Sequence, residues 1–230
     1  MIRAILFDLD DTLYIEGDFF RSGFAIVAAI LEARGIAPAA EACAILESIH
    51  FGGQREGVFD RAAVRLDFPA SWVPELVRIF RSHEPAIAPA RDVPAALERL
   101  HSRYKLGCVT DGWADVQRRK LVALGLEPFF DSLVIADDKG RAFWKPHTLP
   151  FLTCCQQLGV VPEEAVFVGD NPERDVRGAY SSGMACIRIR RHLGYYSAKD
   201  FPGDDAVAEI TDLTELDALL QRQGCTEEGP

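Results

Sequence analysis

Short apolar runs alternate with longer stretches of helical periodicity along most of the chain. The apolar runs occupy residues 2–7, 105–109, 133–136, 165–168 and 186–189. Runs of this length with β-branched and aromatic residues are typical of buried strands, and the periodic stretches between them are typical of crossover helices. This alternation predicts an α/β fold with a parallel sheet that is covered by helices on both faces.

One segment, residues 18–82, departs from this alternation. It has no strand-like run, and its apolar residues recur at helical spacing in stretches such as FAIVAAILEARG and SWVPELVRIFRSH. Glycine and proline divide the segment into about four predicted helices. We therefore expect a small all-helical domain over residues 15–86, inserted after the first strand of a core that comprises residues 1–14 and 87–230.

Composition restricts the class of protein. The chain has 230 residues, of which 48% are hydrophobic, and is long enough for one α/β domain with a small insert. A formal net charge of −10 argues against binding to nucleic acid, which requires a basic surface. Two basic clusters are interpreted as solvated edges of helices and strands: Arg118-Arg119-Lys120, and Arg188 with Arg190 and Arg191.

The sequence also lacks the features of membrane and secreted proteins. No uncharged apolar stretch is long enough to cross a bilayer, and Asp8 interrupts the N-terminal apolar run, which argues against a signal peptide. The six cysteines include no Cys-x-x-Cys pair and have no histidine at zinc-binding spacing. We therefore expect a cytoplasmic protein with reduced thiols and no membrane partner.

Polar residues follow the predicted strands directly. In doubly wound sheets, ligands bind at the carboxyl ends of the strands, so these residues are the candidates for a functional site. A lysine next to a proline also precedes the helix between the third and fourth apolar runs. The candidate residues are Asp8, Asp10 and Asp11 after the first run, Thr110, Asp111 and Gly112 after the second, Lys145, and Asp170 and Asp175 after the fourth.

This set of side chains has a definite chemistry. Several carboxylates at one edge of a sheet stay ionised together only if a cation joins them, and oxygen ligands without histidine or cysteine favour Mg²⁺. Lys145, Thr110 and the amides of a glycine-containing turn suit a phosphoryl group. A carboxylate aimed at phosphorus can act as a nucleophile and form an aspartyl phosphate.

Four stretches in this order resemble the motifs of the haloacid dehalogenase superfamily: DLDDTL, the threonine of VTDG, the lysine of WKP, and GDNPERD. The intervening stretches QRRKLVALGLEPFFDSLVIAD and GAYSSGM are similar to the phosphatase branch of that superfamily. The resemblance spans nearly the whole chain. It implies a Rossmann-like core, a helical cap inserted after the first motif, and Mg²⁺-dependent hydrolysis of a small-metabolite phosphomonoester.

The resemblance also implies roles for the matching residues. Asp8 would be the nucleophile, and Asp10 would protonate the leaving oxygen and then activate water. Thr110 and Lys145 would hold the transferring phosphoryl group.

The same resemblance implies the metal ligands. Asp8, the backbone carbonyl of Asp10, and Asp170 would bind Mg²⁺. Asp175 would support Lys145 or a metal-bound water.

The remaining assignments concern single residues. Asp111 and Gly112 are candidate substrate-binding residues, and Arg55 of the helical insert is a candidate substrate contact because arginine binds anionic and polar ligands. Asp11 is expected in a turn or in local hydrogen bonding. Arg174 departs from the family pattern because it stands where asparagine is common.

Several functions remain open from the sequence. A dehalogenase of the same superfamily is disfavoured because that branch lacks the second aspartate, which is Asp10 here. A phosphonate hydrolase is disfavoured because it would use a lysine of the helical insert to form a Schiff base, and residues 15–86 contain no lysine. A phosphosugar mutase shares the core chemistry, and a non-catalytic binding module is the alternative from outside enzymes. The substrate class expected is a nucleotide or sugar phosphate. The sequence decides neither the particular ester nor the oligomeric state.

Overall fold

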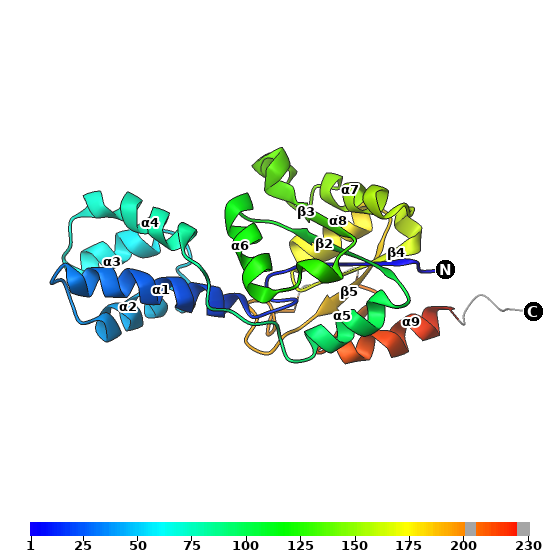
Figure 1. Cartoon of the computed structure of the whole chain (residues 1–230), viewed down its shortest axis with the longest axis horizontal. Helices are drawn as coiled ribbons and strands as arrows, with labels where there is room; N and C mark the ends of the chain where they lie inside the picture. Colours follow the sequence, from blue (N-terminus) through cyan, green and yellow to red (C-terminus); the bar gives the residue numbers. More distant parts are fainter. Residues whose placement is uncertain (201–205, 225–230) are drawn as a thin grey trace, which may run out of the picture. The chain divides into compact units, whose positions relative to one another are not determined.

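The computed structural model describes residues 1–200 and 206–224. The chain forms two compact units, one of Met1–Glu16 with Ala88–Pro230 and one of Gly17–Ile87. Figure 1 shows an α/β arrangement in the first unit and a group of helices in the second. The sheet with its helical insertion after the first strand agrees with the architecture predicted from the sequence.

The first unit contains a parallel sheet that has six strands within the described residues, in the order β3-β2-β1-β4-β5-β6. All five predicted strands are present. The sixth, β6, was not predicted, because its three residues form too short an apolar run to be recognised. The strands are β1 (Ala4–Phe7), β2 (Lys105–Thr110), β3 (Ser132–Ile135), β4 (Ala165–Gly169), β5 (Ala185–Ile189) and β6 (Ala208–Ile210).

Helices cover this sheet. They are α5 (Val93–His101), α6 (Ala114–Leu124), α7 (Leu149–Leu158), α8 (Arg177–Ser181) and α9 (Leu216–Gly224). Arg99 of α5 and Arg103, two residues after the end of α5, form ion pairs with Asp217 of α9. Every residue of the central strands β1 and β4 is buried, as expected for strands with both faces covered.

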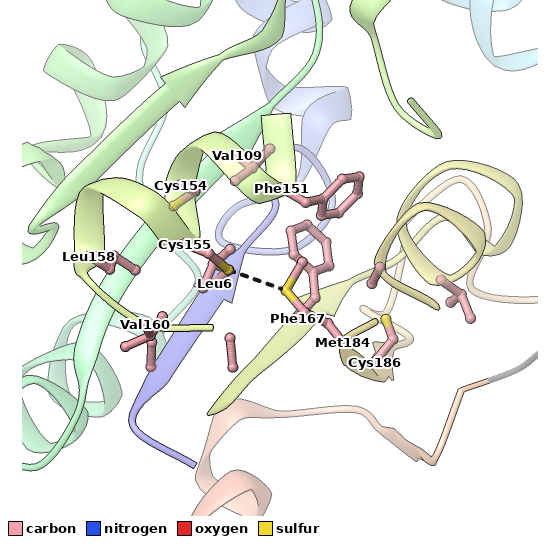
Figure 2. Close-up of a cluster of buried hydrophobic side chains, with 14 residues drawn as sticks. Leu6, Val109, Phe151, Cys154, Cys155, Leu158, Val160, Phe167, Met184 and Cys186 are labelled. Carbon is pink, nitrogen blue, oxygen red and sulfur yellow. Dashed lines mark hydrogen bonds between the residues drawn. The ribbon is translucent and has the colours of Figure 1, made fainter. Parts of the chain in front are cut away.

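A buried cluster joins α7 to one face of the sheet (Figure 2). The rings of Phe151 and Phe167 pack edge to face with their centroids 4.9 Å apart. Cys155 lies 3.8 Å from the sulfur of Met184. The five cysteines in the described part of the chain are free, as expected for reduced thiols.

The second unit consists of four helices within the described residues, as predicted. They are α1 (Glu16–Ala33), α2 (Ala39–Phe51), α3 (Val58–Leu66) and α4 (Val73–Ser82). Their shared interior is aromatic: Phe24 packs against Phe80 with ring centroids 5.5 Å apart, and His50 stacks on Phe20 at 3.8 Å. Among the described residues, no helix has the length and apolar character needed to span a membrane.

His50 makes this helical unit sensitive to acid. Its side chain is buried, and Nδ1 has no hydrogen-bond partner in the described structure. Burial, with a smaller contribution from the Arg55 charge, lowers the pKa of His50 to about 4. Below pH 6.5 the His50 side chain therefore binds a proton in the unfolded chain, whereas in the folded chain it does not bind one until about pH 4. The contribution of neutral, buried His50 to the free energy of unfolding is complete above pH 6.5 and is lost as the pH falls.

We expect the His50→Phe variant to lose less stability than the wild type on acidification. The difference between the two proteins in the change of unfolding free energy from pH 7.5 to pH 5 should be about 2 kcal/mol. Urea unfolding at both pH values measures it. The same pH dependence in both proteins would show that His50 is not the titrating group.

Candidate active site

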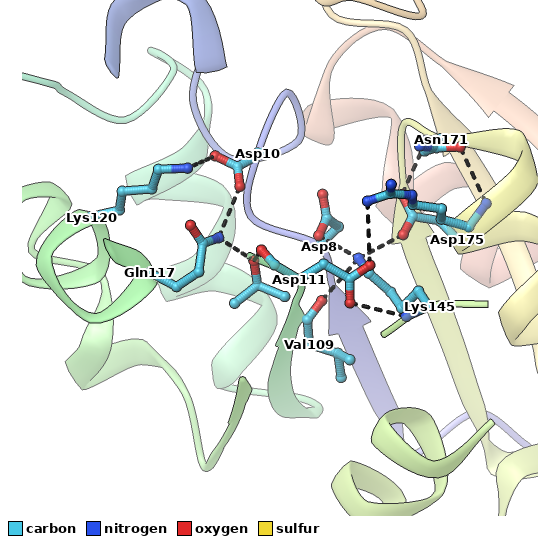
Figure 3. A network of polar contacts seen from close by, with 11 residues as sticks. Asp8, Asp10, Val109, Asp111, Gln117, Lys120, Lys145, Asn171 and Asp175 are labelled. Atoms are coloured by element: carbon cyan, nitrogen blue, oxygen red, sulfur yellow. Dashed lines mark hydrogen bonds and ion pairs between the residues drawn. The ribbon is translucent and has the colours of Figure 1, made fainter. Parts of the chain in front are cut away.

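The carboxyl ends of three central strands meet at one edge of the sheet. Phe7, the last residue of β1, lies opposite Cys108 of β2 and Val168 of β4. This register places Asp8, Thr110 and Asp170, at the ends of β1, β2 and β4, at the same edge. The loop before α7 brings Lys145 to Asp8 there (Figure 3). Asp8, Thr110, Lys145 and Asp170, four of the residues that the sequence predicted at this edge, therefore lie there.

Lys145 is the centre of this group. Its Nζ lies 2.5 Å from Asp8 Oδ1 and 2.7 Å from Asp175 Oδ1, and it donates a hydrogen bond to the Val109 carbonyl at 3.2 Å. Burial disfavours the ammonium, but the carboxylates of Asp175 and Asp8 outweigh burial and raise the pKa of Lys145 well above its usual value. A buried charge of this kind must be paired because desolvation is costly, so Lys145 is held as a cation between two carboxylates.

Three buried carboxylates form an acidic cluster beside Lys145. Oxygens of Asp8, Asp170 and Asp175 all lie within 4.8 Å of one another. Burial, followed by repulsion from neighbouring carboxylates, raises the pKa of Asp170, and burial is also the largest cause of the raised pKa of Asp8. A divalent cation would remove this repulsion. The all-oxygen donor set fits Mg²⁺, and the acidic cluster contains two of the expected ligands together with Asp175.

The turn after β4 fixes the position of Asp175. Oδ1 of Asn171 accepts hydrogen bonds from the backbone amides of Glu173 and Arg174 at 3.0 and 3.2 Å. The backbone amide of Asn171 donates to Asp175 Oδ2 at 3.0 Å. Gly169 lets the carboxylate approach the strand, because a Cβ at this position would lie 2.5 Å from Asp175 Oδ2. The turn thus directs Asp175 back to the strand ends.

Asp10 faces away from Lys145 and toward α6 (Figure 3). Its Oδ1 lies 2.6 Å from Lys120 Nζ and accepts a hydrogen bond from the Tyr14 hydroxyl, while Oδ2 accepts one from Gln117 Nε2 at 2.8 Å. Burial alone would raise the pKa of Asp10, but the Lys120 ammonium and the hydrogen-bond donors lower it. Gln117 Nε2 also donates to Thr110 Oγ1 at 2.6 Å.

Sequence reasoning missed Gln117 and Lys120. Lys120 was interpreted as part of a solvated basic cluster, and this interpretation is wrong because its side chain is buried against Asp10. The same error applies to Arg188, which is fully buried and donates to the carbonyls of Tyr196 and Lys199. It also applies to Arg191, which is buried and pairs with Asp92. The available signal was the spacing of three residues between Gln117 and Lys120, which places both on one face of α6.

The turn after β2 carries two more candidate residues. Asp111 Oδ1 accepts a hydrogen bond from the Lys145 amide at 3.0 Å, and Arg174 Nη1 lies 3.7 Å from Asp111 Oδ2. Gly112 has a φ of 117°, and a Cβ there would lie 3.1 Å from the Gln117 side chain. These contacts connect the turn to both sides of the site, and a role for Asp111 and Gly112 in substrate binding stays a prediction.

Asp11 has the local hydrogen-bonding role expected of it. Its φ is 53°, and its carboxylate accepts hydrogen bonds from the amides of Glu16 and Tyr195, each at 2.8 Å. It therefore fastens the loop after β1 to the loop after β5 and lies outside the acidic cluster.

The remaining candidate, Arg55, lies in the helical unit between α2 and α3. Its guanidinium lies over the ring of Phe20, 5.5 Å from the centroid. Its assignment as a substrate contact stays a prediction.

Comparison with known proteins shows the family to which the chain belongs. The family model "Haloacid dehalogenase-like hydrolase" matches residues 5–189. The glyceraldehyde 3-phosphate phosphatase of Methanopyrus kandleri is 34% identical over 222 residues, which cover 91% of this chain and 92% of the relative. The phosphoserine phosphatase of Thermus thermophilus is 32% identical over 242 residues, covering 94% and 92%. The chain therefore belongs to the haloacid dehalogenase-like hydrolases.

A solved structure supports the fold. A haloacid dehalogenase-type hydrolase of Bacillus subtilis, whose crystal structure holds magnesium, superposes with a TM-score of 0.72 at 21% identity, covering 95% of this chain and 98% of that protein. At this identity the likeness concerns the fold alone.

Proposed function

We propose that the protein is a Mg²⁺-dependent phosphatase that hydrolyses a small phosphorylated metabolite through an aspartyl phosphate at Asp8. The observation that carries the proposal is the buried group in which Lys145 lies between Asp8 and Asp175, with Asp170 beside them. Phosphatase activity in relatives that match more than nine-tenths of the chain supports it.

The proposed reaction has two steps. In the first, the Asp8 carboxylate attacks phosphorus, and the leaving oxygen takes a proton from Asp10 as its bond to phosphorus breaks. Lys120 lowers the pKa of Asp10 in the free protein, so this step requires that Asp10 take up a proton when the anionic substrate binds. In the second, Asp10 takes a proton from the water that attacks the aspartyl phosphate, which releases inorganic phosphate and restores Asp8. Lys145 and Thr110 bind the phosphoryl oxygens throughout.

Asp8 and Asp170, with the backbone carbonyl of Asp10, would hold Mg²⁺, and Asp175 would keep Lys145 in place. When bound, the ion supplies positive charge that neutralises the phosphoryl group and the carboxylates around it. Without that charge, the acidic cluster would repel an anionic substrate.

The substrate class we propose is a nucleotide or sugar phosphate. Glyceraldehyde 3-phosphate, which the Methanopyrus kandleri relative hydrolyses according to its name, is one member of this class. We assign leaving-group recognition to the helical unit acting as a cap, with Arg55 as its candidate contact, and to Asp111 and Gly112 of the core.

Turnover should require Mg²⁺ and be suppressed by excess Ca²⁺, because Ca²⁺ takes more ligands at longer distances and would displace Asp8 from phosphorus. The measurement is release of inorganic phosphate from an aryl phosphate and from a panel of phosphorylated metabolites, with Mg²⁺, with Ca²⁺ and with chelator. Full activity in excess chelator would contradict the proposal.

The same panel separates the alternatives. A mutase would return an isomeric phosphate ester in place of inorganic phosphate, and a dehalogenase would release halide from a 2-haloacid. A binding module would turn over no substrate. An Asp8→Asn sample purified in parallel reports any contaminating phosphatase.

A further inference from the structure

Three side chains outside the four motifs surround the carboxylate of Asp10. Lys120 and Tyr14 contact one oxygen and Gln117 contacts the other. All three are at least 95% buried. We call Tyr14, Gln117 and Lys120 the Asp10 clamp.

The helix α6 supplies two members of the clamp. Gln117 and Lys120 are three residues apart and therefore lie on the same face, one turn apart. The helix begins at Ala114, directly after the turn of residues 111–113 that follows Thr110, the last residue of β2. One rigid element thus carries both contacts to the loop after β1, where Asp10 is found.

Gln117 joins Asp10 to Thr110. An amide nitrogen has two hydrogens, and Gln117 Nε2 lies 2.8 Å from Asp10 Oδ2 and 2.6 Å from Thr110 Oγ1. A single side chain therefore fixes the separation between these two groups. In the proposed reaction, one of them moves the proton and the other holds the phosphoryl group.

We propose that Gln117 and Lys120 are positioning residues for the reaction, which they serve by holding the Asp10 carboxylate in one place relative to Thr110. This inference rests on the proposed function. Neither side chain touches the reacting atoms. Their effect passes through Asp10, because a proton-transfer group displaced by about 1 Å can cost on the order of 10²-fold in rate.

The test uses Lys120→Met and Gln117→Met, which keep most or all of the length of each side chain and remove its donor. With an aryl phosphate and saturating Mg²⁺, each variant should lose about 10- to 100-fold in kcat while KM changes less than about threefold. Arg118→Met is the matched control. It removes an exposed ion pair to Asp138 from the same helix and should leave kcat unchanged.

A double-mutant cycle distinguishes positioning from a general structural role. If Lys120 acts through Asp10, then Lys120→Met should lower kcat little further in an Asp10→Asn protein. The same fold-loss in both backgrounds would overturn the inference. If Lys120→Met fails to fold, the cycle between Gln117→Met and Asp10→Asn decides in the same way.

Thermal unfolding separates this inference from the proposed function. The losses of Tm in Lys120→Met and Asp10→Asn should be less than additive in the double variant, because both substitutions remove the same contact between Lys120 and Asp10. Additive losses of Tm would contradict the inference that Lys120 holds Asp10, even if the enzyme is active. A wild-type protein that turns over no phosphate ester would overturn the proposed function, and with it the catalytic part of the inference, whatever the Tm cycle shows.

Discussion

Replacing Asp8 by asparagine is expected to abolish turnover, by at least about 10⁴-fold, as the loss of a covalent nucleophile does in other enzymes. The amide attacks phosphorus poorly, and it also removes one negative ligand from the acidic cluster of Asp8, Asp170 and Asp175. Phosphoenzyme should be absent by intact mass after incubation with an aryl phosphate and Mg²⁺.

The variant should nevertheless fold. Lys145 keeps its ion pair with Asp175 at 2.7 Å, and one source of repulsion among buried carboxylates is removed. Asp138→Asn is the matched control, because Asp138 is exposed and pairs with Arg118; it should retain wild-type activity. Near-normal turnover in Asp8→Asn would mean that another group is the nucleophile.

Replacing Asp10 by asparagine is expected to lower turnover by about 10²–10⁴-fold, the usual contribution of a positioned acid–base group. The first step should suffer less with an aryl phosphate, because a good leaving group needs little protonation. The second step still needs a base for water, so a covalent intermediate should accumulate on Asp8. Burst kinetics and intact mass measure both effects.

Affinity for Mg²⁺ should survive in Asp10→Asn. The Asp10 side chain contacts α6 and lies outside the acidic cluster, and the substitution keeps the backbone carbonyl that we propose as a ligand. Loss of Mg²⁺ affinity without a catalytic defect would contradict the division of roles between Asp8 and Asp10.

The two expectations differ because the two aspartates occupy different surroundings, although only Leu9 separates them in the sequence. Asp8 faces Lys145, which is 137 positions away along the chain, and Asp10 faces Lys120, which is 110 positions away. Neither partner follows from local pattern. The roles implied by the family resemblance can be assigned without these partners, but the electrostatic setting of each carboxylate cannot.

The sequence by itself determined the class of fold and the candidates for the site. Apolar runs predict strands because a strand buried on both faces needs apolar side chains throughout, and the polar residues after those runs then fall at one edge. The helical insert was recognisable because its apolar residues recur at helical spacing over residues 18–82. These signals are local, so a single sequence contains them.

Only the tertiary structure decided which polar side chains are buried and what they contact. It placed Asp175 in the acidic cluster, directed the Asp10 carboxylate toward α6, and buried Lys120 and Gln117 on the face of α6 that meets Asp10. Whether a lysine lies in solvent or in an ion pair depends on a partner brought from a distant part of the chain, because a buried ammonium is tolerated only beside an opposite charge. Local periodicity contains no information about that partner.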